Sequence, residues 1–339
     1  MNNKDICQRN LVEEFCRKIA NNKLLVQGSG GNVSWKENDK LWIKASGKRM
    51  SHAGKENIFV GITNKSLKKK IENNDFTIDS SILSQNKLRP SIEIFLHALI
   101  KYRVVVHLHE VETLAFLVRK NSRQEINTIM KRKKNWCFLN YYMPGEILAE
   151  QIYKKICKAP NLSIFFLKNH GVIIGANNIV EIESKLKNLC KLFVSKTINL
   201  RSERKNKTSA INLKYFEPIS NPHLNNLVLN RNLFHHLKNN WGLFPDHVVF
   251  LDRQATIIPK TSKINLDSEE YSKIPFIFFE QDRIYQNKNI SCNCLDQLEC
   301  YYNVIIRQEN GSNLSKLSKK QIQALLNWDL EKYRLSLSK

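Results

Sequence analysis

The sequence contains no long apolar run. Nothing in its 339 residues approaches the ~18 consecutive apolar residues that a membrane-spanning helix requires. The first ten residues, MNNKDICQRN, also lack the apolar core of a signal peptide. Together these absences predict a cytoplasmic protein without a membrane partner.

Cysteine is sparse and widely spaced. The eight cysteines are scattered between Cys7 and Cys300 and do not form the dense framework of a small secreted protein, which agrees with a reducing compartment. Cys292, Cys294 and Cys300 lie close together, but they lack the C-x-x-C spacing of a structural zinc site. We expect these three cysteines to be free thiols.

The common nucleotide-binding loops are also missing. The chain contains no G-x-x-x-x-G-K-[ST] motif and no G-x-G-x-x-G after a predicted strand. The segments Gly28–Asn32 and Ala45–Gly47 do offer backbone N–H groups and small polar side chains, and such loops can cradle a phosphate. Taken singly, each segment is a turn.

Acidic residues are few relative to basic ones. Asp and Glu total 31 against 54 Lys and Arg, which gives a formal net charge of +23. A solvated, lysine-rich surface is the simpler explanation, although such an excess also attracts phosphates on nucleic acid, membranes or small substrates. No basic stretch is interleaved with aromatic residues, so we expect no nucleic-acid partner. Salt-sensitive, metal-independent nucleic-acid binding is the alternative.

Hydrophobic periodicity divides the chain up to residue 200 into mixed helices and strands. The pattern predicts helices over 8–22, 91–102, 113–119, 146–158 and 180–200. It predicts strands over 33–35, 41–43, 104–109, 164–167 and 172–174, the first two joined as a hairpin. The elements do not follow a regular β-α-β order, which favours an α/β fold with a mixed or antiparallel sheet.

A change in composition marks the best candidate for a domain boundary. Residues 201–212 (RSERKNKTSAIN) are polar and charged. We therefore predict one domain over 8–200 and a C-terminal extension over 201–339 that packs on it without supplying metal ligands. In the extension the pattern shows short apolar pieces at 248–251 and 274–279 and a final helix near 319–333.

Three histidines form the clearest chemical pattern. His107 and His109 are two residues apart in a predicted strand, so both imidazoles lie on one face, close enough to bind one metal ion. His170 lies in a predicted tight turn, where Gly171 allows close backbone approach. Alone, each has an ordinary structural explanation. Together, three neutral imidazoles with an open position have the composition of a catalytic zinc site.

Glu93 lies in the predicted helix just before the strand that carries His107 and His109. His97 follows one turn later on the same helix face. A carboxylate beside a metal can act as the base for a proton next to a carbonyl group. A solvated glutamate favoured by the helix dipole is the alternative.

Six motifs, in this order, resemble the class II aldolase/adducin family. They are GSGGNVSW (28–35), KASG (44–47), RPSIEIFLHALI (89–100), VVVHLHEVETLA (104–115), YYMPG (141–145) and LKNHGVIIGA (167–176). FPDHVVFL (244–251) and NWDLEKYR (327–334) resemble the end of the aldolase half in proteins that join a rhamnulose-1-phosphate aldolase to a short-chain dehydrogenase. The dehydrogenase half itself has no counterpart in this sequence.

The resemblance implies a fold and a ligand set. The fold is a three-layer α/β/α arrangement with a mixed, mainly antiparallel central sheet, in a homo-oligomer that by family analogy is a tetramer. One zinc ion per chain, or another divalent metal, is implied at His107, His109 and His170. Glu93 matches the family's catalytic acidic residue.

The resemblance also implies a place for the substrate. Asn32, Ser46, Gly47 and Ser91 match positions that bind the substrate phosphate, and Tyr141 matches a proton donor to the leaving aldehyde. Two features complicate the assignment of the family's site residues to this sequence. Ile92 stands where the family often has a second small residue, and Tyr142 is as available as Tyr141. His247 lies in the extension, where we expect a structural histidine.

These implications predict a zinc-dependent aldolase-type lyase. It would cleave a small keto-sugar, phosphorylated or hydroxylated, through a metal-bound enediolate. A sugar-phosphate epimerase or dehydratase would use the same metal site. A non-catalytic, adducin-like interaction module is the alternative from another class, and its relatives lack this set of ligands.

Overall fold

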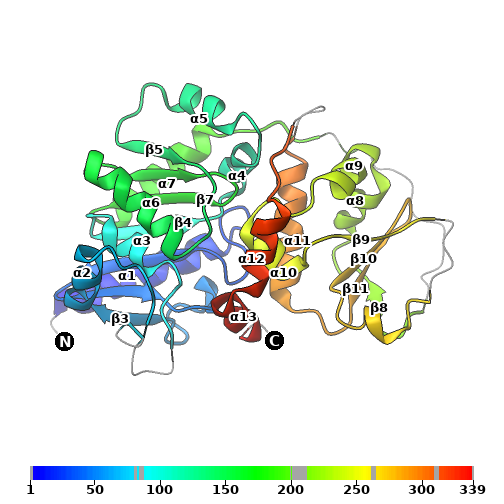
Figure 1. The fold of residues 1–339 in the computed structure, drawn as a ribbon, viewed down its shortest axis with the longest axis horizontal. Coiled ribbons are helices and arrows are strands. Elements are labelled where there is room, and N and C mark those ends of the chain that lie inside the picture. Colours follow the sequence, from blue (N-terminus) through cyan, green and yellow to red (C-terminus); the bar gives the residue numbers. More distant parts are fainter. Residues whose placement is uncertain are drawn as a thin grey trace. The chain divides into compact units, whose positions relative to one another are not determined.

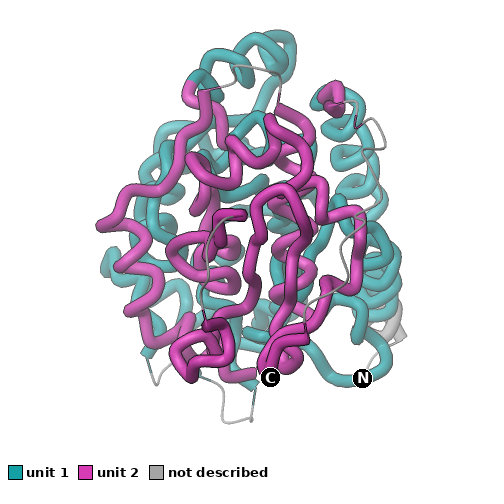
Figure 2. The backbone as a smooth tube through the Cα atoms, turned by 90° about the vertical axis from the view of Figure 1, so that its right-hand side faces the viewer, with its two compact units in different colours: residues 1–117, 121–194 teal, residues 118–120, 195–339 magenta. Residues whose placement is uncertain are grey.

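The structure is a computed structural model that describes residues 3–79, 82–83, 88–198, 200, 212–260, 265–308 and 313–337. The chain divides into two compact units, coloured separately in Figure 2. Unit 1 comprises residues 1–117 and 121–194, and unit 2 comprises residues 118–120 and 195–339. The predicted boundary segment 201–212 lies outside the described residues except for Asn212. The packing of the extension on the first domain stays a prediction.

Unit 1 is built on one seven-stranded sheet with the order β3-β2-β1-β4-β7-β6-β5 (Figure 1). Neighbouring strands are antiparallel except β5 and β6, which are parallel. The expected mixed, mainly antiparallel sheet is therefore confirmed. The strands are β1 (Asn32–Glu37), β2 (Lys40–Lys44), β3 (Phe59–Thr63), β4 (Val104–Leu108), β5 (Trp136–Leu139), β6 (Ile164–Leu167) and β7 (Gly171–Ala176).

Helices cover both faces of this sheet. The helices are α1 (Asn3–Ala20), α2 (Asn64–Glu72), α3 (Ile94–Leu99), α4 (Val111–Leu117), α5 (Ser122–Met130), α6 (Glu146–Lys158) and α7 (Ile179–Leu192), with a short 3-10 turn at Met50–His52. On one face, α2, α3 and α6 form a core with Val105 and Ile173 of the central strands. On the other, Phe193 at the end of α7 packs against Phe116 of α4 and Phe166 of β6. The three-layer α/β/α arrangement follows.

The residues of β4 explain its central place. Val104, Val105 and Val106 are all fully buried, because a strand covered by helices on both faces needs apolar side chains at consecutive positions. The predicted hairpin is also confirmed, since β1 pairs with β2 in antiparallel register and Asn38 adopts a left-handed φ of 52° in the turn.

Some predicted helices are shorter in the structure. The helix expected over 91–102 begins only at Ile94, because Ser91 Oγ accepts a hydrogen bond from the backbone N–H of Glu93 and forms a turn there. The helix expected over 180–200 ends at Leu192, where Phe193 turns out of helical geometry with its ring in the core. The final helix expected over 319–333 is interrupted at Trp328, which is extended.

Unit 2 contains a small four-stranded sheet with the order β8-β11-β10-β9. Its strands are β8 (Phe216–Pro218), β9 (Thr256–Ile258), β10 (Phe276–Phe279) and β11 (Ile284–Asn287). Its helices are α8 (Asn226–Leu229), α9 (Arg231–Asn239), α10 (Pro245–Leu251), α11 (Cys292–Ile305), α12 (Lys319–Asn327) and α13 (Asp329–Ser336), with 3-10 turns at Pro222–Asn225 and Glu269–Tyr271. The paired, fully buried Ile277 and Tyr285 anchor its core.

Two further expectations concern the cysteines and a membrane-spanning helix. Cys292, Cys294 and Cys300 are free thiols, as predicted from their spacing. Within the described ranges, every helix is too short or too polar to cross a membrane.

Candidate metal centre

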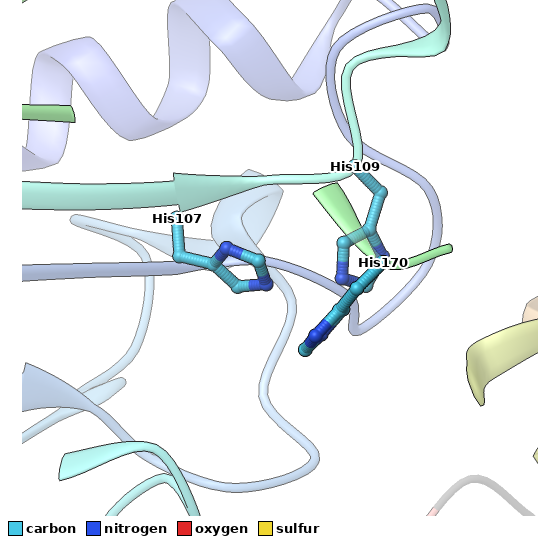
Figure 3. A group of neighbouring side chains, drawn as sticks. All are labelled: His107, His109 and His170. Atoms are coloured by element: carbon cyan, nitrogen blue, oxygen red, sulfur yellow. The ribbon is translucent and has the colours of Figure 1, made fainter. Parts of the chain in front are cut away.

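The three predicted ligands come together at one end of the unit 1 sheet. His107 lies on β4, His109 follows that strand, and His170 lies in the turn between β6 and β7, so the rings face a common space (Figure 3). One ring nitrogen of each histidine lies within 4.8 Å of those of the other two, and all three side chains are buried. The ring centroids are 4.8–5.4 Å apart. Among the described residues, this is the one group of histidines, cysteines and carboxylates arranged to hold a metal ion.

Gly171 is what allows the two histidine-bearing segments to approach. A Cβ atom at this position would lie 2.4 Å from the carbonyl oxygen of Leu108 and 3.1 Å from Cδ2 of His109. Contacts this short are not tolerated, so the start of β7 could not pair with the end of β4 if residue 171 carried a side chain. The glycine therefore belongs to the architecture of the site.

Backbone pairing also fixes the protonation of His107. The carbonyl oxygen of Val172 accepts a hydrogen bond from Nδ1 of His107 at 3.2 Å, which places the proton on Nδ1. The Nε2 atom is left buried without a hydrogen-bond partner, with its lone pair available. Burial, and then the neighbouring imidazoles, lower the pKa of His107 well below its usual value. A neutral imidazole whose other nitrogen donates to a carbonyl is the form that binds a metal.

Glu93 lies beside two of the three imidazoles. It is the residue before α3, and its carboxylate oxygens lie 3.6 Å from Nε2 of His107 and 3.5 Å from Nε2 of His170. Its side chain is buried, and Oε2 accepts a hydrogen bond from Nδ2 of Asn32 at 2.7 Å. The structure thus brings five predicted site residues together, from β1, the start of α3, β4 and the β6–β7 turn. Three imidazoles and one carboxylate form a donor set that fits Zn²⁺.

The predicted phosphate-binding residues lie on loops at the same end of the sheet. Ser46 and Gly47 follow β2, whose partner β1 begins at Asn32. Ala45 forms a β-bridge with Pro90, and the backbone N–H of Ser46 donates to the carbonyl oxygen of Arg89. This bridge joins the segment of Ser46 to the segment of Ser91.

Tyr141 lies in the loop after β5. Because β5 and β6 are parallel and end together, this loop is at the same end of the sheet as His170. The hydroxyl oxygen of Tyr141 is buried, whereas the ring of Tyr142 packs against the core on the α3 and α6 face. The role predicted for Tyr141 stays a prediction.

Sequence reasoning missed the partner of His97 and the burial of Lys44. Ser34 Oγ and Nδ1 of His97 share a hydrogen bond of 2.7 Å that ties β1 to α3. Lys44, the last residue of β2, is only 2% exposed. Its one signal in the sequence is that it directly follows the apolar Trp42 and Ile43 and precedes the A-S-G turn.

Comparisons with known proteins show the family of the chain. The model of the "Class II Aldolase and Adducin N-terminal domain" matches residues 10–192. L-fuculose phosphate aldolase of Methanocaldococcus jannaschii is 27% identical over 177 residues, which are 50% of this chain and 83% of that protein. The uncharacterized oxidoreductase YuxG of Bacillus subtilis is 28% identical over 85 residues, which are 25% of this chain and 12% of that protein.

A solved structure is similar to about half of the chain. The N-terminal class II aldolase domain of a conserved protein from Thermoplasma acidophilum is 24% identical, with a TM-score of 0.44, and the match covers 53% of this chain and 92% of that one. The matched family model spans more than half of the 339 residues. The chain therefore belongs to the class II aldolase and adducin family.

Proposed function

We propose that the protein is a zinc-dependent lyase that cleaves a small phosphorylated keto-sugar by an aldol-type reaction. The observation that carries this proposal is the position of Glu93, whose carboxylate lies within 3.6 Å of Nε2 of both His107 and His170. A metal ion bound by His107, His109 and His170 would supply Lewis-acid polarisation of the substrate carbonyl. The remaining chemistry falls to the chain's own side chains.

Glu93 is proposed to move the proton. A carboxylate at this position can take a proton from a substrate hydroxyl and return it to carbon after the carbon–carbon bond breaks. The hydrogen bond from Asn32 Nδ2 holds Oε2 in place. Tyr141 is proposed to donate a proton to the departing aldehyde, since its loop lies at the same end of the sheet.

Small polar residues are proposed to hold the substrate phosphate. Ser46, Gly47 and Ser91 lie on the two segments that the Ala45–Pro90 bridge joins. The name of the Methanocaldococcus jannaschii relative, a sugar phosphate aldolase, supports a phosphorylated substrate. Short hydroxyl side chains and a glycine let an anion approach the backbone closely.

Two measurements on the purified chain test this function. Metal analysis should find one divalent ion per chain, most simply zinc, and removal by a chelator followed by zinc addition should abolish and restore turnover. A screen of ketose phosphates should then find one substrate that releases an aldehyde. A product epimerised or dehydrated with its carbon chain intact would replace the aldolase by the corresponding enzyme. A chain that carries no metal and turns over no sugar would favour the interaction module.

Assembly and location belong to the same proposal. We propose a cytoplasmic homo-oligomer, with a tetramer expected by analogy with the family. Light scattering of the purified chain measures the mass of the assembly, and a value near the 39.6 kDa of one chain would contradict an oligomer.

A further inference from the structure

Lys44 is a buried charge that joins two loops. Its ammonium donates hydrogen bonds to the carbonyl oxygen of Ser29 at 3.0 Å and to that of Lys48 at 2.6 Å. Ser29 belongs to the glycine loop 28–32, and Lys48 ends the loop that contains Ser46 and Gly47. Burying an ammonium is costly unless its donors are satisfied, so both bonds are needed to keep Lys44 where it is.

These two bonds restrict the spacing of the loops. Both carbonyl oxygens converge on one nitrogen atom, so they lie no further apart than the two hydrogen bonds laid end to end. The glycine loop is fixed independently at its other end, because a Cβ at Gly31 would lie 2.9 Å from the carbonyl oxygen of His107. Lys44 therefore connects the loop that packs on the ligand-bearing strand β4 with the loop that carries Ser46.

Lys44 lies on the face of the sheet opposite to Glu93. It follows Ile43, whose side chain lies in the core with Val105, and alternation along a strand directs Lys44 to the opposite face. Burial raises the pKa of Cys16 in α1, the helix on that opposite face, and the charge of Lys44 opposes this rise. Asn32 bonds Glu93 on the α3 side, so Lys44 supports the loops from the α1 side without entering the catalytic centre.

We propose that Lys44 is a positioning residue for phosphate: it holds the glycine loop and the Ser46–Gly47 loop at the spacing that one phosphate group requires, a role that rests on the proposed function. The ammonium of Lys44, which is bonded to both loops, also favours an anion over a neutral ligand at this end of the sheet. Loss of the ammonium would free both carbonyl oxygens and let the loops separate.

Lys36 provides a matched control. It is a half-buried lysine of the same sheet, on the neighbouring strand β1, and its ammonium also donates to a backbone carbonyl, that of Ile100. Ile100 follows α3 and belongs to neither loop. Lys36→Met and Lys44→Met therefore each remove an ammonium that donates to a backbone carbonyl, but only the second change releases the loops.

The experiment measures binding of inorganic phosphate by titration calorimetry, together with metal content and kinetic constants, for the full chain and its variants. Lys44→Met should raise the phosphate Kd and the KM for a phosphorylated substrate by roughly 10- to 100-fold, the loss expected when displaced loops no longer make one hydrogen bond to the charged phosphate. Metal content should stay at the wild-type value. Lys44→Gln keeps a neutral donor and should fall between wild type and Lys44→Met. Lys36→Met should bind phosphate as wild type does.

Equal weakening by Lys36→Met and Lys44→Met would overturn the proposal, because loss of a lysine that bonds neither loop would then have the same effect. If Lys44→Met does not fold, Lys44→Gln decides, and wild-type phosphate binding by that variant would also overturn it. Metal-dependent turnover of an unphosphorylated sugar, without phosphate binding, would overturn this inference but leave the metal centre standing. Phosphate binding that depends on Lys44 in a chain without aldolase turnover would overturn the proposed reaction and support Lys44.

Discussion

His107 and His247 are fully buried histidines of different units, and they are surrounded differently. His107 in unit 1 faces two other imidazoles and the carboxylate of Glu93. His247 in unit 2 lies among aromatic rings, with centroids 4.3 Å from Trp241 and 4.6 Å from Tyr301. Burial lowers the pKa of both histidines. Burial and a lowered pKa therefore do not identify a metal ligand, whereas convergent nitrogen and carboxylate atoms do.

The two histidines also differ in the hydrogen bond that Nδ1 makes. Nδ1 of His107 donates to the carbonyl oxygen of Val172 and leaves Nε2 as an acceptor beside the other imidazoles. Nδ1 of His247 instead accepts a long hydrogen bond, 3.4 Å, from the backbone N–H of Leu243. The first arrangement prepares a lone pair for a cation, and the second places a proton on the other nitrogen.

The largest effect is expected from removing a ligand from the first cluster. His107→Ala should lower metal affinity by more than about 100-fold, the upper range for loss of a group that merely orients a ligand, and should abolish turnover. His247→Phe, which keeps an aromatic ring in the second cluster, should retain one metal per chain. Elemental analysis of both purified variants checks this. Full metal content in His107→Ala would remove the distinction between the two histidines.

The next effect concerns the carboxylate that only the first cluster has. Glu93→Gln should keep the metal and reduce turnover by ~100- to 10,000-fold, because an amide cannot accept the proton. Glu110→Gln is the control, since Glu110 is also buried but accepts hydrogen bonds from Thr113. Its turnover should stay within a few-fold of wild type. Inactivity of Glu93→Gln that follows from metal loss alone would make Glu93 a ligand and not a base.

A smaller effect is expected at the predicted phosphate loop. Ser46→Asp places a negative charge where the phosphate would bind and should raise the KM for a phosphorylated sugar by roughly 10-fold or more, with metal content unchanged. Ser46→Ala removes the hydroxyl without adding charge and should change the KM less. Steady-state kinetics of the two variants makes the comparison. An equal effect of both substitutions would show that charge at residue 46 is not sensed by the substrate.

The smallest effect is a pH dependence in unit 2. The pKa of His247 is lowered to about 3, whereas an unfolded histidine titrates near ~6.5. Between these values the unfolded chain binds more protons, so the free energy of unfolding falls as the pH drops, by up to about 1.4 kcal/mol per pH unit. His247→Phe should therefore lose about 2 kcal/mol less than wild type between pH 7 and pH 5. Urea unfolding at both pH values measures this, and identical losses would contradict it.

His97 contributes in the same direction in unit 1, since burial lowers its pKa to about 3. This histidine is retained in His247→Phe, so some loss of stability at low pH should persist in that variant. The difference between wild type and variant isolates the contribution of His247.

Much of the candidate metal centre could be predicted from local patterns. Alternation in a strand places His107 and His109 on one face, and a glycine after His170 indicates a close approach, because both signals depend on neighbouring residues alone. Glu93 could be placed near them only through the family resemblance. The contacts of its carboxylate with two imidazoles depend on the turn at Ser91, which shortens the predicted helix.

The parts that could not be predicted depend on contacts distant in sequence. Lys44 is buried because carbonyl groups of two loops converge on it, and no periodicity reveals such convergence. The order of strands in the sheet places β1 between β2 and β4, although the chain passes through β3 before β4. The ends of helices are set in the same way, as at Phe193, whose ring is held by Phe116 and Phe166.

The pairing of β4 with β7 has a consequence for folding. His107 and His109 lie beside His170 because Leu108 pairs with Val172. A shift of one residue along the strands would turn the histidine side chains to opposite faces of the sheet. A cation at this point would bind the correctly aligned sheet and not its slipped or open forms. At a concentration a thousandfold above its Kd, it would add about 4 kcal/mol to the free energy of unfolding. The ion would thus stabilise the pairing of the two central strands, and only in the correct register.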